Sequence, residues 1–261
     1  YDVIILGEFP VTDQFVTDLT DWVGGGGVLV AFRPDARLCG LLGITSSGGT
    51  LTDAYLLVSN TTGPGAGIVG ETIQFHSAAD LYSLSGATAL ATLYSDASTA
   101  TSYPAVTEIL VGANGGKAYA FTYDLPRSVV YTRQGNPAWA GQKRDGKIDP
   151  IRSDDMFVPP LDLSEPGWID LNKVAIPQAD EQQRLLANII IRGSMHRKVL
   201  PRFWFLPRGL KAAVVMTGDN HGDAGMEPRF QRDITMSPAG CIVEDWECVR
   251  STGYFYVGST D

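Results

Sequence analysis

The start of the chain alternates apolar runs with amphipathic helical segments, and this order limits the folds open to it. Residues 1–7 and 28–32 are apolar runs followed by turn residues, a pattern typical of strands covered on both faces. Residues 12–23 place apolar side chains at helical spacing and end at the glycines 24–27. A second, shorter helix is expected over 35–42. This order predicts a parallel sheet with right-handed crossovers.

The middle of the chain has β character. A glycine-rich hairpin signal at 114–116 and turns rich in Gly, Ser and Thr separate its strand-like runs. They predict a β-rich insertion, or a sheet edge, grafted onto the α/β core. The strand-like runs are 51–58, 72–75, 87–94, 106–111 and 117–123.

Two domains are expected, joined by a short connector. A long helix is predicted over 180–195, and prolines bound the segment 200–207 that follows it. We therefore place a first domain at 1–199, a linker at 200–210 and the start of a second α/β domain at 211–261. The chain opens directly on a core strand, so we expect an excerpt of a longer polypeptide with further domains.

Composition excludes two classes of partner. The chain of 261 residues has a formal net charge of −9, which disfavours binding to nucleic acid or to an anionic membrane surface. No apolar run reaches the roughly 20 residues that a membrane helix requires, so no membrane span is predicted.

The three cysteines suggest different roles. Cys39 falls in an apolar helical stretch, where a cysteine usually acts as a small buried hydrophobic residue. Cys241 and Cys248 lie close together, and we expect them to form a disulfide if the protein is exported. A secreted or cell-surface bacterial protein is the corresponding expectation.

The clearest chemical motif follows the apolar run 212–216. Asp219, Asn220 and His221 come directly after this run. A buried strand that delivers carboxylate, amide and imidazole groups at its carboxyl end is a common way to build a metal or acid–base site. The motif predicts such a site in the second domain.

The first domain resembles the class I glutamine amidotransferase-like superfamily, in the broad sense that includes the middle domain of some β-galactosidases. The similarity is carried by residues 1–7, 21–23, 24–35 and 117–124. It implies a flavodoxin-like fold, a parallel sheet with helices on both faces. The turn after 28–32 lacks the nucleophilic cysteine of active amidotransferases, so this domain is expected to be noncatalytic.

The second domain resembles the start of a polysaccharide deacetylase domain. The similarity rests on the segment 217–222, in which Asp219 matches the family's catalytic base. Asn220 stands where the family has a metal-binding aspartate, and His221 is the residue that would compensate as a ligand. The resemblance implies a divalent metal, zinc or similar, held only in the complete protein.

The polar loop 132–166 offers a second candidate site. Arg133, Asn136 and Trp139 have the stacking and hydrogen-bonding groups that bind a sugar. The alternative is a loop pinned to the body by a buried Trp139. Two simpler interpretations concern other residues: His76 is expected to be a surface or internally satisfied histidine, and Asp154 and Asp155 are expected to be solvated rather than to bind calcium.

The sequence thus favours a fragment of a secreted carbohydrate-active protein, with a metal-dependent hydrolase of amide or ester bonds in its second domain. Its expected partner is a carbohydrate or polysaccharide. The alternative is a noncatalytic glycan- or partner-binding module with a decayed metal site. A weaker possibility is an amide hydrolase that uses Cys39.

Overall fold

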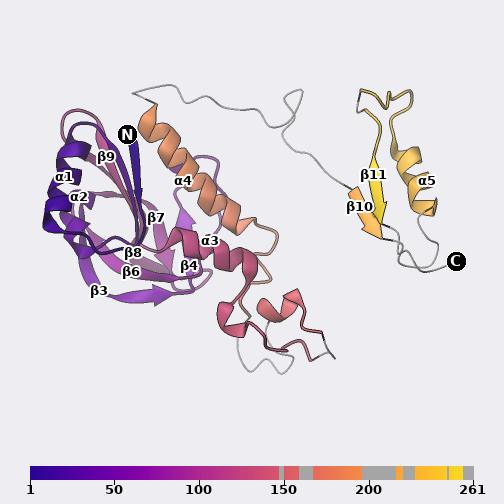
Figure 1. Ribbon diagram of the computed structural model, residues 1–261, viewed down its shortest axis with the longest axis horizontal. Helices are drawn as coiled ribbons and strands as arrows, with labels where there is room; N and C mark the ends of the chain where they lie inside the picture. Colours follow the sequence, from indigo (N-terminus) through magenta and orange to yellow (C-terminus); the bar gives the residue numbers. More distant parts are fainter. Residues whose placement is uncertain (147–149, 159–166, 196–215, 220–226, 246, 255–261) are drawn as a thin grey trace. The chain divides into compact units, whose positions relative to one another are not determined.

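The computed structural model describes residues 1–146, 150–158, 167–195, 216–219, 227–245 and 247–254. The chain divides into two compact units, 1–200 and 201–261. Each unit is a separate body, and the larger one contains the main sheet and the helices that cover it (Figure 1).

The main sheet of the first unit has seven strands, and it is mixed rather than parallel. The first three strands of its spatial order pair in parallel, and all the other neighbouring strands pair in antiparallel fashion. In spatial order the strands are β1 (Val3–Leu6), β2 (Val28–Phe32), β9 (Gly116–Phe121), β8 (Ala100–Val111), β7 (Thr88–Tyr94), β4 (Tyr55–Val58) and β5 (Ile73–Gln74).

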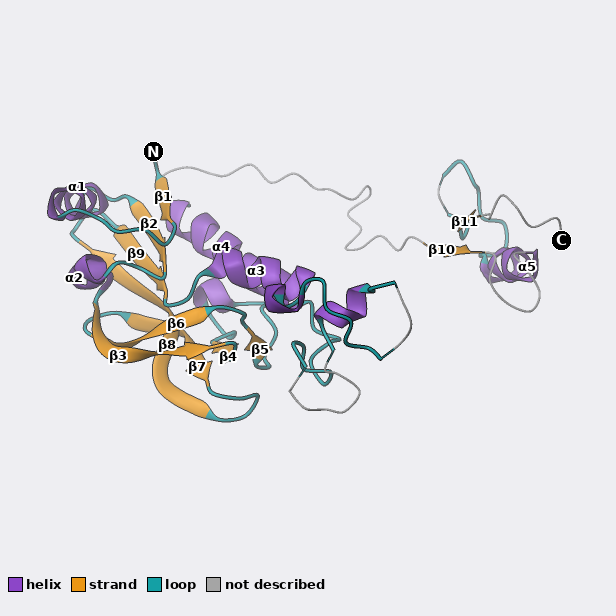
Figure 2. Cartoon of the chain, turned by 60° about the horizontal axis from the view of Figure 1, so that its bottom comes forward, coloured by secondary structure: helices purple, strands orange, loops and turns teal. Residues whose placement is uncertain are grey.

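The expected flavodoxin-like parallel sheet is therefore wrong. Short turns join β7 to β8 and β8 to β9, and a short turn can connect only antiparallel neighbours, because parallel pairing needs a long crossover. The β-rich middle of the chain is not an insertion beside the sheet, because it supplies most of the strands (Figure 2).

A second, two-stranded sheet packs against β8 in the first unit. It pairs β3 (Ile44–Thr52) with β6 (Ala78–Leu84) in antiparallel fashion, and the register shifts between Ser46 and Thr50. Gly48 and Gly49 lie at this irregularity with φ of 71° and 84°, a left-handed conformation that glycine adopts without steric penalty.

Helices cover both faces of the parallel strands. On one side lie α1 (Asp13–Gly24) and α2 (Cys39–Leu42), and on the other α3 (Leu125–Gln134) and α4 (Gln178–Ser194) (Figure 1). The Thr12 side chain begins α1 by accepting a hydrogen bond from the Phe15 N–H group. Short 3₁₀ turns at Ala36–Leu38, Gly63–Gly65, Pro137–Trp139 and Ser153–Met156 complete the described elements of this unit.

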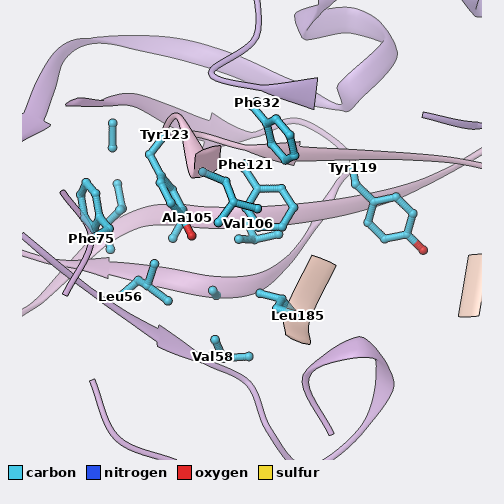
Figure 3. Close-up of a cluster of buried hydrophobic side chains, with 14 of the residues drawn as sticks. Phe32, Leu56, Val58, Phe75, Ala105, Val106, Tyr119, Phe121, Tyr123 and Leu185 are labelled. Atoms are coloured by element: carbon cyan, nitrogen blue, oxygen red, sulfur yellow. The ribbon is translucent and has the colours of Figure 1, made fainter. Parts of the chain in front are cut away.

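Side-chain alternation along β2 explains why all five of its residues are buried. Val28, Val30 and Phe32 point into the core beneath α4, whereas Leu29 and Ala31 point into the core beneath α1 and α2. Figure 3 shows the first core, in which the Phe121 ring packs edge-on against Phe32 at a centroid distance of 5.4 Å.

The second unit is small. Strands β10 (Met216–Asp219) and β11 (Ser251–Tyr254) pair in parallel, and α5 (Glu227–Met236) lies between them in sequence. A disulfide joins Cys241 and Cys248, the pair that the sequence favours.

Candidate functional site

A pocket of about 350 Å³ lies in the first unit, where β4 and β5 meet the loop that follows α3. Its walls come from segments far apart in the sequence. We call it the aromatic pocket, and its lining residues are Asp53, Tyr55, Gln74, His76, Asn136, Trp139, Gly167 and Trp168.

His76 is the most unusual residue of the aromatic pocket. Its side chain is 2% exposed, and neither ring nitrogen has a hydrogen-bond partner among the described residues. The ring stacks on Trp168, with centroids 4.1 Å apart and an interplanar angle of 16°. Buried polar groups in native proteins are nearly always hydrogen-bonded. An unpaired imidazole in a pocket wall is therefore available to bond a ligand.

The electrostatics keep this imidazole neutral. Burial lowers the pKa of His76 to about 4, so at neutral pH one ring nitrogen can donate a hydrogen bond and the other can accept one. Its Nδ1 atom lies 3.9 Å from Oδ1 of Asp53. Burial raises the pKa of Asp53, although its side chain remains 42% exposed.

The backbone of Asp53 is held in an uncommon conformation. Its φ is 48°, in the left-handed region that non-glycine residues seldom adopt, Asn and Asp being the usual exceptions. The Asp53 N–H group donates to the Ser77 carbonyl, and this bond fixes the turn between β3 and β4. Strained backbone of this kind is concentrated at functional sites.

A buried polar network positions the backbone of His76. The His76 N–H group donates to Oγ of Ser128 at 3.1 Å, and this hydroxyl donates to Oε1 of Gln182 at 2.8 Å. The Gln182 Nε2 group donates a hydrogen bond to the Gln74 carbonyl at 3.0 Å. Residues of α3 and α4 therefore hold the segment that carries the imidazole, and Ser128 and Gln182 are positioning residues.

Hydrogen bonds also position Trp168. Its indole N–H donates to the Tyr131 carbonyl at 2.9 Å, and its carbonyl accepts a bond from Gln74 Nε2 at 3.3 Å. The Gln74 Oε1 atom accepts the Asp170 N–H group at 2.8 Å. Both ends of the Gln74 side chain are thus used to attach the 167–170 segment to β5.

Tyr55 adds a hydroxyl group to the lining. Its O–H donates to Oδ2 of Asp170 at 3.1 Å. Burial, with the neighbouring Asp170 carboxylate, raises the pKa of Tyr55 to about 12, so the phenol stays protonated at neutral pH.

Two of the three ligand-binding residues predicted from the loop line this pocket. Trp139 is buried, and the Arg144 guanidinium lies 3.7 Å from its ring centroid. The Asn136 Oδ1 atom accepts the Ala138 N–H group and caps a 3₁₀ turn, which leaves its Nδ2 group available to a ligand. The burial of Trp139 agrees with the alternative of a loop pinned by a buried Trp, and the sugar site stays a prediction.

Arg133 lies elsewhere. Its Nη2 atom contacts Oδ1 of Asp180 at 2.5 Å and Oε1 of Gln183 at 2.7 Å. It therefore links α3 to α4 and is not among the residues that line the aromatic pocket. It contributes instead to a separate cavity of about 220 Å³.

The residues of the predicted metal site are only partly described. Asp219 is the last residue of β10, where its backbone is paired with Tyr254. Asn220 and His221 lie outside the described residues. The predicted roles of Asp219, Asn220 and His221, and the divalent metal, stay predictions.

An acidic cluster in the 145–155 region is internally compensated. Carboxylate oxygens of Asp145, Asp154 and Asp155 lie within 4.8 Å of one another. The Asp155 carboxylate accepts three backbone N–H groups, which lower its pKa, and Lys143 Nζ lies 2.7 Å from Asp145. Asp155 is fully buried, so the expectation that it is a solvated acid is wrong.

A larger groove, of about 800 Å³, lies beyond the carboxyl ends of β1 and β2. Arg33, with φ of 42°, crosses it and forms ion pairs with Glu8 and Asp80 at 3.0 and 3.1 Å. The charged groups of Arg33, Glu8 and Asp80 in this groove are therefore already paired with one another. Burial raises the pKa of Cys39 nearby, which disfavours a reactive thiolate and the hydrolase that would use it.

Comparison with known proteins gives only slight likenesses. No family model matches the chain, and no curated protein matches it. Similar solved structures include a β-galactosidase from Rahnella sp. R3, at 22% identity and a TM-score of 0.38, covering 51% of this chain and 23% of that one. An exo-β-1,4-mannosidase from Opitutaceae bacterium strain TAV5 matches at 22% identity and a TM-score of 0.39, and the match covers 51% of this chain and 22% of that one. The mmIFT52 N-terminal domain matches at 15% identity and a TM-score of 0.37, and the match covers 49% of this chain and 68% of that one.

These findings correct the family expectations. The chain spans less than a quarter of the length of the two glycosidases it is compared with. With no family model and a mixed sheet, the amidotransferase-like and polysaccharide deacetylase-like assignments are wrong, and with them the deacetylase function. Carbohydrate-acting proteins are among the similar structures, and no helix in the described part of the chain is long and apolar enough to span a membrane.

Proposed function

We propose that the first unit is a noncatalytic binding module whose aromatic pocket holds one saccharide unit of a glycan. The observation that carries the proposal is the buried, unpaired imidazole of His76 stacked on Trp168 beside the pocket. A pyranose ring combines apolar C–H faces with a rim of hydroxyl groups. The aromatic side chains of the pocket can pack on the C–H faces of the sugar, and its polar groups can hydrogen-bond the hydroxyl rim.

The available donors and acceptors support a hydroxyl-rich ligand. Neutral His76 offers one donor and one acceptor, Asn136 offers an N–H₂ group, and Asp53 offers a carboxylate. A volume of about 350 Å³ is near the lower end of the usual range for ligand pockets, which suits a single ring.

A catalytic alternative has less support. Most glycoside hydrolases use two carboxyl groups that flank the scissile bond. Among the described residues that line the aromatic pocket, Asp53 supplies the only carboxylate. The Asp170 carboxylate nearby already accepts bonds from Tyr55 and from the Asn172 N–H group.

Titration calorimetry with a panel of monosaccharides and short oligosaccharides tests the proposal. Asn136→Ala should weaken binding about fivefold, because one hydrogen bond is worth about 1 kcal/mol. His76→Gln should weaken it more, since a flexible amide replaces a ring held by stacking. Thr50→Ala, in the groove crossed by Arg33, is the matched control and should bind as the parent does. Equal binding by all four proteins would refute the pocket as the site.

We also propose a secreted or cell-surface location. The Cys241–Cys248 disulfide supports it, because disulfides persist mainly in oxidising compartments. Measuring free thiols in protein taken from its native host compartment tests this proposal, which predicts one free thiol, that of Cys39.

A further inference from the structure

The aromatic pocket has an uneven charge. Asp53 is the only residue with a full charge at neutral pH among the described residues that line it, since burial keeps His76 neutral and Tyr55 protonated. The His76 imidazole lies beside the Asp53 carboxylate, with Nδ1 3.9 Å from Oδ1. Burial raises the pKa of Asp53, because its charged form loses hydration. A cation from a ligand would remove this penalty.

Aromatic rings line the same pocket as the carboxylate. Tyr55, Trp139 and Trp168 line the same pocket, and the faces of such rings attract cations within about 6 Å of the centroid. One ring already holds a cation, since Arg144 lies 3.7 Å from the Trp139 centroid. The pocket therefore combines a carboxylate with the rings that bind ammonium groups.

The spacing of two acceptors suits a primary ammonium group. Oδ1 of Asp53 and Nδ1 of His76 are 3.9 Å apart. A nitrogen placed about 2.8 Å from each atom can donate one N–H bond to the carboxylate and one to the imidazole. Neutral His76 can accept at Nδ1 when its proton is on Nε2.

Neighbouring basic residues of this region have other partners. Lys173 pairs with Glu71 at 3.0 Å, and Arg133 pairs with Asp180. Lys143 pairs with Asp145. None of these three basic side chains is among the groups that line the pocket in the described part of the chain.

We infer that the saccharide unit bound in the aromatic pocket carries a free amino group, as in a 2-amino-2-deoxyhexose, and that Asp53 and His76 receive its ammonium group. The inference rests on the proposed function, because it names the class of sugar bound at the same site.

Calorimetry on the full chain at pH 7 compares D-glucosamine and D-galactosamine with D-glucose, D-galactose and N-acetyl-D-glucosamine. At least one amino sugar should bind ten times more tightly than its neutral counterpart. N-acetylation should abolish the advantage, because it removes the charge while keeping the nitrogen.

The variant Asp53→Asn removes the charge with almost no change of shape. Asn tolerates the left-handed backbone of this position, so the fold should persist, and circular dichroism checks this. The variant should lose the tenfold preference for the amino sugar over its neutral counterpart, because the charge that creates the preference is gone. Asp80→Asn is the matched control, because it removes a carboxylate from the other groove, and it should keep the preference.

The outcomes separate the two proposals. Equal affinity for amino and neutral sugars, unaffected by Asp53→Asn, would overturn the amino-sugar inference and leave the saccharide function standing. A preference that survives Asp53→Asn would also overturn it. Failure of every sugar to bind the folded parent protein would overturn the saccharide function itself.

Discussion

At the residue scale, His76 combines two properties that the sequence did not predict. A histidine directly after a short apolar run is expected to be exposed or internally bonded, yet this one is buried with both nitrogens unpaired among the described residues. Its stacking partner Trp168 is distant in sequence. Nothing local to His76 indicates that contact, because only the packing of the 167–170 segment on β5 creates it.

The buried imidazole should make the stability of the protein depend on pH. The pKa of His76 is about 4 in the folded protein and 6.5 ordinarily. As the pH falls from 6.5 to 4, the unfolded chain gains a proton that the folded chain does not. The free energy of unfolding should therefore fall, by at most about 3 kcal/mol. Above pH 6.5 this contribution is constant.

Urea unfolding across this pH range measures the effect. Asp53 opposes this loss of stability. Because its pKa is raised in the folded protein, the folded chain binds a proton at Asp53 before the unfolded chain does as the pH falls. The comparison is therefore between the parent and His76→Gln, whose free energy of unfolding should change less over the same interval. Parallel curves for the two proteins would contradict the buried neutral imidazole.

At the element scale, the sequence predicted local structure better than pairing. The βαβ pattern of the first residues indicated β1, α1 and β2, and these elements form with β1 and β2 parallel. The strand-like runs of the middle were also recognised. Their assignment to an insertion was wrong, because hairpin partners and sheet order depend on contacts between distant strands.

Arg133 illustrates the same limit at the α3–α4 junction. Its position in a polar loop-like segment suggested ligand binding, whereas the fold turns it toward Asp180 and Gln183 on α4. Arg133→Ala should lower the free energy of unfolding by less than about 1 kcal/mol, since the pair is half exposed.

The same variant should bind saccharides as the parent does, because Arg133 is not one of the residues that line the aromatic pocket. Asn136→Ala, three residues further along in the loop that follows α3, should lose affinity. Calorimetry on both proteins checks this contrast. A large loss of affinity in Arg133→Ala would restore the interpretation made from the sequence.

At the scale of the whole molecule, the site depends on parts of the chain, distant in sequence, that meet around the edge of the mixed sheet. The β3–β4 turn supplies Asp53, the end of β5 supplies His76, and the loop after α3 supplies Asn136 and Trp139. Sequence reasoning found the last of these, because Trp, Asn and polar residues gather there. It missed the first two, since each is unremarkable in its own segment and acquires meaning only from the fold.

The most direct test is nuclear magnetic resonance of the histidine ring nitrogens, with the signals of His76 assigned by comparison with His76→Gln. At pH 7 both nitrogens should report a neutral ring. Addition of a binding saccharide should shift them saturably, with the affinity measured by calorimetry. Ring signals that stay unchanged while a saccharide saturates the protein would contradict the aromatic pocket as the binding site.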